Sequence, residues 1–489
     1  MHLLQPELHT RRAFLRRSGR LAMAGTALPF ALNLAAMGEA AAFEATDYKA
    51  LVCLFMFGGN DYANTVVTYD DPSYNAYSTI RGGGVGQTAG GIALAKSDLT
   101  ATLLSPTVAL PDARQYALHP SMTGLAGLFN AGKAAVQLNV GPLVAPTTLA
   151  QYKSSNRALN PLPPNLFSHN DQQSIWQSSS PEGSTIGWGG NMGDLALSSN
   201  ATSLFTCISV SGNAVFLSGD TALQYQIGTD NAVKINGVTN NVYGSSAVRD
   251  AMRSITQAPS SQILENEYNA ITRRSIVAEG TMTAALNTVP ANTAPFNTFT
   301  GSNPLSNQLR MVARIIASRN TLSSKRQVFF VSMGGFDNHD GLLNSHVNNL
   351  GRVSSALTEF YNATLALGVA DKVTAFTASD FGRTLASNGD GSDHGWGSHH
   401  LMVGGAVNGK AFYGTAPPVS VGTTTAPADQ WHVGQGRLLP STSVDQYAAT
   451  LAKWFGVADS ELMGILLNIG RFGTAAGRPD YPSNLGFMV

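Results

Sequence analysis

The stretch ALVCLFMF at residues 50–57, followed directly by GGND at residues 58–61, decides the fold. The first part is continuously apolar. It lacks the alternation of apolar and polar residues that is typical of a strand with one solvent-exposed face. Such a run is typical of a strand in a parallel sheet, because helices cover both faces of that sheet. We therefore predict a buried strand that ends in two glycines and then a carboxylate, Asp61.

Two later segments repeat this design. QVFFVSM runs into GGFD within residues 327–337, and VTAFTAS at residues 373–379 runs into Asp380. In open α/β sheets, ligands bind outside the carboxyl ends of the strands. We therefore expect Asp61, Asp337 and Asp380 to meet at one sheet edge and to form a candidate site there.

Helical patterns alternate with these strands. Amphipathic spacing predicts helices at 120–132, 342–367 and 444–455, and a further strand at 134–140. The helix at 342–367 stands between two of the key strands, as a crossover between parallel strands requires. The prediction is one α/β domain at residues 43–489, with a mostly parallel central sheet and helices on both faces.

The region at about 197–305 has a different pattern, which we interpret as an insertion or cap on that domain. It mixes predicted short strands at 204–210 and 214–217 with polar turns. A predicted helix at about 260–286 follows, and then a loop at 287–303 that is rich in Pro, Thr and Asn.

Composition excludes some classes of protein. The 489 residues are 43% hydrophobic, which is typical of a globular protein, and their formal net charge is +0. A nucleic-acid-binding protein would need a basic field, so we expect no nucleic-acid partner. Cys53 and Cys207 cannot make a disulfide scaffold, and both lie in apolar runs. We expect buried thiols, with a single bridge as the alternative.

The N-terminus resembles a twin-arginine export signal. TRRAFLR at residues 10–16 contains the arginine pair Arg11 and Arg12, and a short Gly/Ala-rich apolar stretch follows at 21–36. We predict a signal peptide at 1–42, the twin-arginine translocase as a partner, and a periplasmic or extracellular protein; the alternative is an amphipathic arm. No later run approaches about 18 uninterrupted apolar residues, so we expect no membrane span after cleavage.

Two polar clusters could hold a metal. GSDHGWGSHH at residues 391–400 carries three of the ten histidines, and FDNHDG at residues 336–341 follows a predicted strand. Mixed Asp and His ligands suit zinc, manganese or iron, and a carboxylate-rich site suits magnesium or calcium. The alternative is that these are solvated loop residues or helix caps.

Ser168 is the candidate nucleophile, in PPNLFSHND at residues 163–171. Its position predicts a helix start, where a serine commonly serves as the N-cap. A hydroxyl that attacks an anionic group would also gain there from the helix dipole. Both interpretations stay open at the level of the sequence.

The order of these motifs resembles a family of exported bacterial proteins known as domain of unknown function 1501, within the alkaline phosphatase and sulfatase superfamily. The resemblance extends over about residues 48–475. It rests on GGND, the Ser-His pair at a helix start, GGFDNH, SDFGR, DHGWGSHH and GGAVNG, together with LHP at 118–120, GRL at 436–438 and TSVDQY at 442–447.

The resemblance implies an alkaline-phosphatase-like three-layer sandwich and a hydrolase of phosphate or sulfate esters. It implies one or two divalent metal ions (zinc, manganese, magnesium or calcium), Ser168 as the nucleophile and Arg383 as an oxyanion-binding group. The implied metal ligands are Asp61, Asp337, His339, Asp380, His394 and His399, with His400 as a rival of His399. The implied substrate is a small anionic ester or a modified extracellular polymer, and the alternative is a non-catalytic, metal-containing surface or binding protein.

This sequence departs from the superfamily at three points. Phe381 stands where alkaline phosphatases have a histidine, and only one residue separates Asp337 from His339. One of the two metals could therefore differ or be absent. Neither cysteine lies in a Cys-x-Pro-x-Arg context, which disfavours a formylglycine sulfatase.

The export signal gives the first prediction. Replacing Arg11 and Arg12 by lysine keeps both charges but removes the guanidinium pair that the translocase recognises. We expect the precursor to stay in the cytoplasm, as measured by cell fractionation. Wild-type levels of the doubly substituted protein outside the inner membrane would contradict this interpretation of residues 1–42.

Overall fold

Strand β1 (Lys49–Met56) lies at the centre of the main sheet, between β7 (Arg326–Met333) and β8 (Val373–Ser379). Both neighbours run parallel to β1 along their whole length. The three apolar runs of the sequence therefore end at one edge of the sheet, as predicted.

The computed structural model describes residues 45–82 and 91–489. The predicted signal peptide at 1–42, with Arg11 and Arg12, lies outside the described residues. None of the described helices is both long enough and apolar enough to cross a membrane. Cys53 and Cys207 are buried free thiols, as expected.

Within the described residues the main sheet has nine strands, in the order β10–β4–β9–β8–β1–β7–β5–β6, and β11 pairs with β4. The other strands of this sheet are β4 (Ala134–Gly141), β5 (Cys207–Ser209), β6 (Gln224–Gln226), β9 (Ser398–Gly404), β10 (Phe412–Tyr413) and β11 (Thr442–Ser443). A separate antiparallel pair is formed by β2 (Val66–Thr68) and β3 (Tyr116–Leu118).

The described part of the sheet contains one reversed strand, β9, which is antiparallel to both β8 and β4. Because β9 runs backwards, its amino end lies at the edge where β8 has its carboxyl end. The segment 380–397 therefore leaves and re-enters the sheet at the same edge. This arrangement concentrates the polar residues of one long loop beside the ends of β1 and β7.

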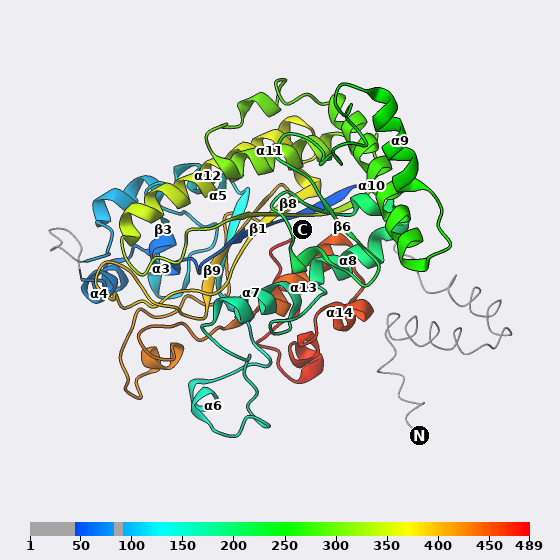
Figure 1. Ribbon diagram of the computed structural model, residues 1–489. Helices are drawn as coiled ribbons and strands as arrows, with labels where there is room; N and C mark the ends of the chain where they lie inside the picture. The colour runs from blue at the N-terminus through cyan, green and yellow to red at the C-terminus, as the bar shows by residue number, and fades with distance from the viewer. Residues whose placement is uncertain (1–44, 83–90) are drawn as a thin grey trace, which may run out of the picture.

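Alternate residues of β1 point to opposite sides of the sheet, which makes two cores. Val52 and Leu54 belong to a core with α5, α11 and α12, whereas Cys53 and Phe55 belong to a core with α8 and α13. Figure 1 shows the result, in which helices cover both faces of the sheet. The three-layer α/β prediction, with a mostly parallel sheet, is confirmed.

The helices have the following bounds: α3 (Tyr62–Thr65), α4 (Asp71–Ile80), α5 (Thr123–Asn130), α6 (Leu149–Lys153), α7 (His169–Ser178), α8 (Trp188–Ala196), α9 (Ser246–Gln257), α10 (Ile263–Asn287), α11 (Pro304–Ala317), α12 (Leu342–Ala366), α13 (Val444–Phe455) and α14 (Asp459–Ile465). The helices predicted at 120–132, 342–367 and 444–455 are confirmed as α5, α12 and α13. The predicted strand at 134–140 is β4.

The region 197–305 contains a strand and an α-helix that were not predicted, β6 and α9, and one predicted element is wrong. The segment predicted as a strand at 214–217 is a short 3₁₀ helix at Val215–Leu217, because an apolar run of this length suits either structure. The other predicted short strand appears as β5, which extends the main sheet beside β7. The boundaries of an insertion or cap stay a prediction; α9 and α10 pack against each other at one end of the molecule (Figure 1).

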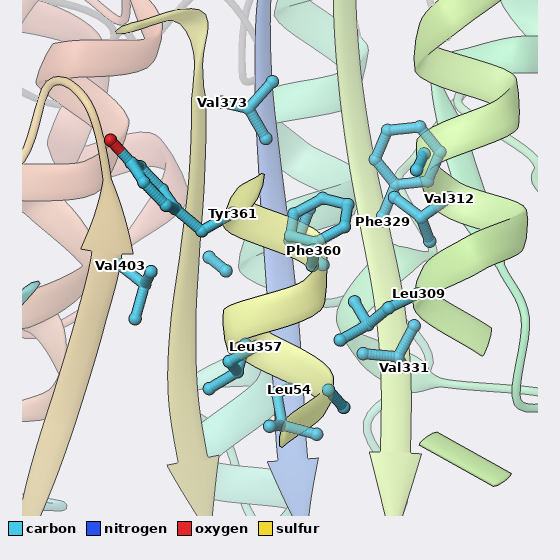
Figure 2. Packing of buried hydrophobic residues seen from close by; sticks show 14 of the residues in the cluster. Leu54, Leu309, Val312, Phe329, Val331, Leu357, Phe360, Tyr361, Val373 and Val403 are labelled. Atoms are coloured by element: carbon cyan, nitrogen blue, oxygen red, sulfur yellow. The ribbon is translucent and has the colours of Figure 1, made fainter. Parts of the chain in front are cut away.

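The larger core fills the space between the sheet and helices α11 and α12. Figure 2 shows Leu309 of α11 and Leu357 of α12 beside Leu54 and Val331 of the sheet. Leu309 is fully buried in this cluster. Close packing of this kind leaves little room for a neighbouring side chain to fill a void.

Leu309→Ala tests the contribution of this core to stability. We expect the free energy of unfolding to fall by about 2–5 kcal/mol, because the substitution removes buried methyl groups and leaves a cavity. Leu365→Ala on α12 is the matched control, since Leu365 is 58% exposed, and its effect should stay within about 0.5 kcal/mol. Denaturant unfolding measures both, and equal losses would contradict this description of the core.

Candidate metal centre

The candidate centre lies at the edge where β1, β7 and β8 end. Asp337 follows β7, Asp380 follows β8 directly, and the loop from β8 to β9 supplies His394. His169 comes from a different part of the chain, as the first residue of α7. The reversed direction of β9 is what brings His394 back to this edge.

Three side chains converge there. One ligand atom each of His169, Asp337 and His394 lies within 4.8 Å of the other two. The Nε2 atoms of His169 and His394 lie 3.4 Å and 3.2 Å from oxygens of the Asp337 carboxylate. His339 adjoins this group, since its Nε2 atom is 3.1 Å from Asp337 and 3.0 Å from Nε2 of His394.

Hydrogen bonds on the far side of two rings orient them toward the centre. Nδ1 of His394 donates to the carbonyl oxygen of Phe167 at 2.8 Å, and Nδ1 of His169 contacts the Asp380 carboxylate at 2.6 Å. A carbonyl and a carboxylate can only accept, so in the neutral ring each Nδ1 carries the proton and each Nε2 atom presents a lone pair toward Asp337. Metal-binding histidines show this same second hydrogen bond.

The Asp380 carboxylate is fully buried and is held by three donors. Besides His169, it accepts hydrogen bonds from Gln173 Nε2 at 2.8 Å and from the backbone N–H of Gly58 at 3.1 Å. Asp380 therefore lies behind His169, where it orients the ring.

The electrostatics of the centre favour added positive charge. The hydrogen bond with Asp380 raises the pKa of His169, although burial acts in the opposite direction. Burial raises the pKa of Asp337, but the hydrogen bond and the charge of Arg383 outweigh it and hold that pKa below its ordinary value. Burial lowers the pKa of His394, and this direction favours the neutral ring that a metal ligand requires.

The donor set fits a divalent metal. Two imidazole nitrogens and one carboxylate oxygen form a ligand set that suits zinc, manganese or iron and leaves coordination positions open. The Nε2 atom of His169 is buried and makes no hydrogen bond to any described residue. A buried polar atom of this kind needs a partner, and a cation between it, Asp337 and His394 would supply one.

Arg383 was expected to bind a substrate oxyanion, but the structure places it inside the protein. Its side chain is fully buried, and Nη1 donates to Asp337 at 2.8 Å and to the carbonyl of Gly58 at 3.0 Å. Nε donates to the carbonyl of Ser392 at 3.0 Å, and Nη2 donates to the same oxygen. Its donors are directed at the protein, and Asp337 is the residue that it positions.

Asp61 was expected as a ligand and lies apart from the three converging side chains. Its buried carboxylate pairs with Arg81 at 2.7 Å and accepts a hydrogen bond from Ser392 Oγ at 2.6 Å. It also accepts from the backbone N–H of Asn64, as the N-cap of α3. Burial raises the pKa of Asp61, but the charge and the hydrogen bond of Arg81 act against it, and the pKa lies below its ordinary value.

His399 and His400 lie in the two cores, away from the centre. Neighbouring residues of β9 point to opposite faces of the sheet, so His399 contacts Tyr62 and Tyr116. His400 contacts Trp176 and Tyr447 on the other face. The structure therefore brings neither histidine to Asp337.

Ser168 occupies the N-cap position of α7, as predicted. Its hydroxyl does not cap a backbone N–H; it donates to the Asp171 carboxylate at 2.9 Å. Ser168 immediately precedes His169, which places the hydroxyl next to the chain segment that supplies a candidate ligand.

In the sequence, His169 stands out only as the neighbour of Ser168, and it was not predicted as part of the site. The helix-start pattern drew attention to the hydroxyl. A signal was present, since a histidine beside the candidate nucleophile begins the same helix. Its contacts with Asp337 and Asp380 come from strands more than 160 residues further along the chain.

The fold and these side chains define an α/β protein with a histidine–carboxylate cluster at the carboxyl edge of its sheet. The model of the family described as "Protein of unknown function (DUF1501)" matches residues 48–464. The chain therefore belongs to this family, as the sequence motifs predicted. A search of curated proteins finds no match.

Solved structures give only weak similarity. Ps i-CgsB in complex with k-i-k-neocarrahexaose has a TM-score of 0.35 at 8% identity and covers 85% of this chain and 74% of that one. Ps i-CgsB alone gives 0.34 at 8% identity, with 90% and 78% covered. The lipoteichoic acid synthase LtaP from Listeria monocytogenes gives 0.29 at 8% identity, with 77% and 68% covered. At such TM-scores the likeness carries no argument.

Metal analysis tests the assignment of ligands. We expect the purified protein to bind a divalent metal that His169→Ala and His394→Ala release, because each loses a nitrogen donor. His399→Gln is the control, since its ring lies among tyrosines, and it should retain the metal. Elemental analysis beside the melting temperature separates ligand loss from unfolding, and metal loss in a folded His399→Gln would support the sequence-based ligand set.

Proposed function

We propose that this protein is a metal-dependent hydrolase of phosphate or sulfate esters. The observation that carries the proposal is the convergence of His169, Asp337 and His394 within 4.8 Å at the carboxyl edge of the sheet. This edge is where open α/β sheets place their ligands. An anionic ester suits a site that attracts a cation, since the cation would offset the charge of the ester.

The side chains of the centre have separate roles in this proposal. His169, Asp337 and His394 would hold the ion, while Asp380 and the carbonyl of Phe167 keep the two rings in place. A bound divalent ion supplies Lewis-acid stabilisation of charge on an ester oxygen. These three ligand atoms would bind a single ion.

Ser168 is the proposed nucleophile. Its Oγ would attack the phosphorus or sulfur atom while its proton passes to Asp171, which already accepts its hydrogen bond at 2.9 Å. The bond to the leaving oxygen breaks, and that oxygen takes up the proton that Asp171 received from Ser168. Water then hydrolyses the serine ester and restores the hydroxyl. The N-terminal end of α7 favours the negative charge of the bound ester.

A non-catalytic metal protein is the second candidate. The hydrogen bonds of Arg383 favour this candidate. The guanidinium that was expected to bind substrate makes its hydrogen bonds inside the protein. In that case the ion would serve only to join the loop of His394 to β7 and α7.

We also propose that the protein acts outside the cytoplasm, after export by the twin-arginine translocase. The support is the sequence TRRAFLR at residues 10–16, followed by a short apolar stretch. Its substrate would then be a small anionic ester or a modified extracellular polymer.

Ser168→Ala distinguishes the two candidate functions. We expect metal content to stay and turnover of aryl phosphate and aryl sulfate esters to be lost, because the hydroxyl attacks and does not hold the ion. Ser245→Ala is the control, since Ser245 caps α9 through the N–H of Val248, and it should cost about 1 kcal/mol of stability without changing turnover. Full turnover in Ser168→Ala would reduce Ser168 to a structural residue. Absence of turnover in a metal-loaded wild-type protein would favour the non-catalytic candidate.

A further inference from the structure

Phe167 joins the metal centre to a second charged group. Its backbone oxygen accepts the hydrogen bond from Nδ1 of His394, and its ring lies 5.4 Å from the guanidinium carbon of Arg437. Phe167 itself has φ +74°, a left-handed conformation that is strained for a bulky residue. Strain of this kind persists where the surrounding structure enforces it, often next to functional groups.

Arg437 is hydrogen-bonded to the backbone of the candidate ligand His394. Its Nε donates to the backbone oxygen of His394 at 2.7 Å, while the ring of Phe167 supports the guanidinium plane. Arg437 is only partly buried. Burial raises the pKa of the nearby Asp393, whereas its hydrogen bonds with Asn388 and His339 and, least, the charge of Arg437 lower it.

The two terminal amino groups of Arg437 are not used by the protein. Neither Nη1 nor Nη2 hydrogen-bonds to any described residue, whereas Nε is fixed by His394. A guanidinium held at one nitrogen and at its face retains paired donors in a fixed geometry. That geometry matches two oxygens of a phosphate or sulfate group.

Arg383 provides the contrast. It is fully buried and its donors are directed at Asp337, Gly58 and Ser392. Of these two guanidinium groups, the one available to an outside anion is therefore that of Arg437, in the motif GRL at 436–438.

We propose that Arg437 binds the tetrahedral oxyanion of the substrate, next to the cation held by His169, Asp337 and His394. This inference rests on the proposed function for its substrate class, a phosphate or sulfate ester. Arg437 is then a specificity-determining residue: it selects esters whose acid part carries a free negative charge. The Phe167 segment holds both His394 and Arg437, so it fixes the distance between cation and guanidinium.

The test uses the metal-loaded full-length protein and inorganic phosphate and sulfate as probes. Calorimetry measures the dissociation constant of each ion for the wild type, Arg437→Gln and Arg437→Lys. We expect Arg437→Gln to weaken binding about tenfold or more, because a charged pair of hydrogen bonds is lost. Arg437→Lys should recover part of the affinity, since it keeps the charge without the planar pair of donors.

Arg319→Gln is the matched control. Arg319 also donates to a backbone carbonyl, that of Ile316 at 3.1 Å, and lies 5.4 Å from an aromatic ring, that of Tyr48. Loss of this arginine should leave anion affinity unchanged. Metal content and melting temperature are measured for every variant, so that lost binding is not confused with lost metal or lost structure.

The outcomes separate this inference from the proposed function. Unchanged affinity in a metal-loaded Arg437→Gln overturns the inference, even if the enzyme hydrolyses esters. No binding of either anion by the wild type overturns it as well. Weakened binding in Arg437→Gln, together with no ester turnover in the wild type, supports the oxyanion site and rejects the hydrolase.

Discussion

The buried guanidinium of Arg383 is the group around which the candidate centre is built. It contacts three segments that are distant in sequence: Gly58 after β1, Asp337 after β7, and Ser392 in the loop before β9. An unpaired charge in this position would cost several kcal/mol, so each segment must present an oxygen to it. The position of Asp337, and with it the geometry of the ligands, follows from this requirement.

A fully buried ion pair, between Arg81 and Asp61, is coupled to Arg383 through Ser392. The carbonyl of Ser392 accepts from Arg383, and its hydroxyl donates to Asp61. Arg383, Ser392, Asp61 and Arg81 are thus joined in one hydrogen-bonded network beneath the site. Such a network is rigid, because moving one member leaves the others buried without partners.

Much of the fold could be predicted from the sequence. Strands β1, β7 and β8 were recognisable because burial on both faces of the sheet requires continuous apolar runs. Helices α12 and α13 were recognisable because apolar residues recur along one face of a helix with its regular spacing. The prediction for Ser398–Gly404 was wrong, since its two histidines resemble metal ligands. Because His399 and His400 are neighbours in a strand, their side chains must point to opposite faces of the sheet. The local sequence pattern did not indicate that β9 is a strand.

The candidate site was predicted only in part, for a related reason. Asp337, His339 and His394 were found because glycine-rich loops with Asp and His follow strands. The role of Asp61 depends on its pairing with Arg81, and that of His169 depends on Asp337 and Asp380. These pairings join residues that the fold alone brings together, so residue type and spacing could not reveal them.

The register of the central strand also has a consequence for how the chain is made. Lys49 of β1 lies opposite Arg326 of β7, and its other neighbour, β8, comes later still. At about 5–20 residues per second, a ribosome would need on the order of tens of seconds to supply the first of these partners. During that interval the most apolar strand of the protein has no sheet to join. We expect the nascent chain to depend on chaperones that shield ALVCLFMF until β7 emerges.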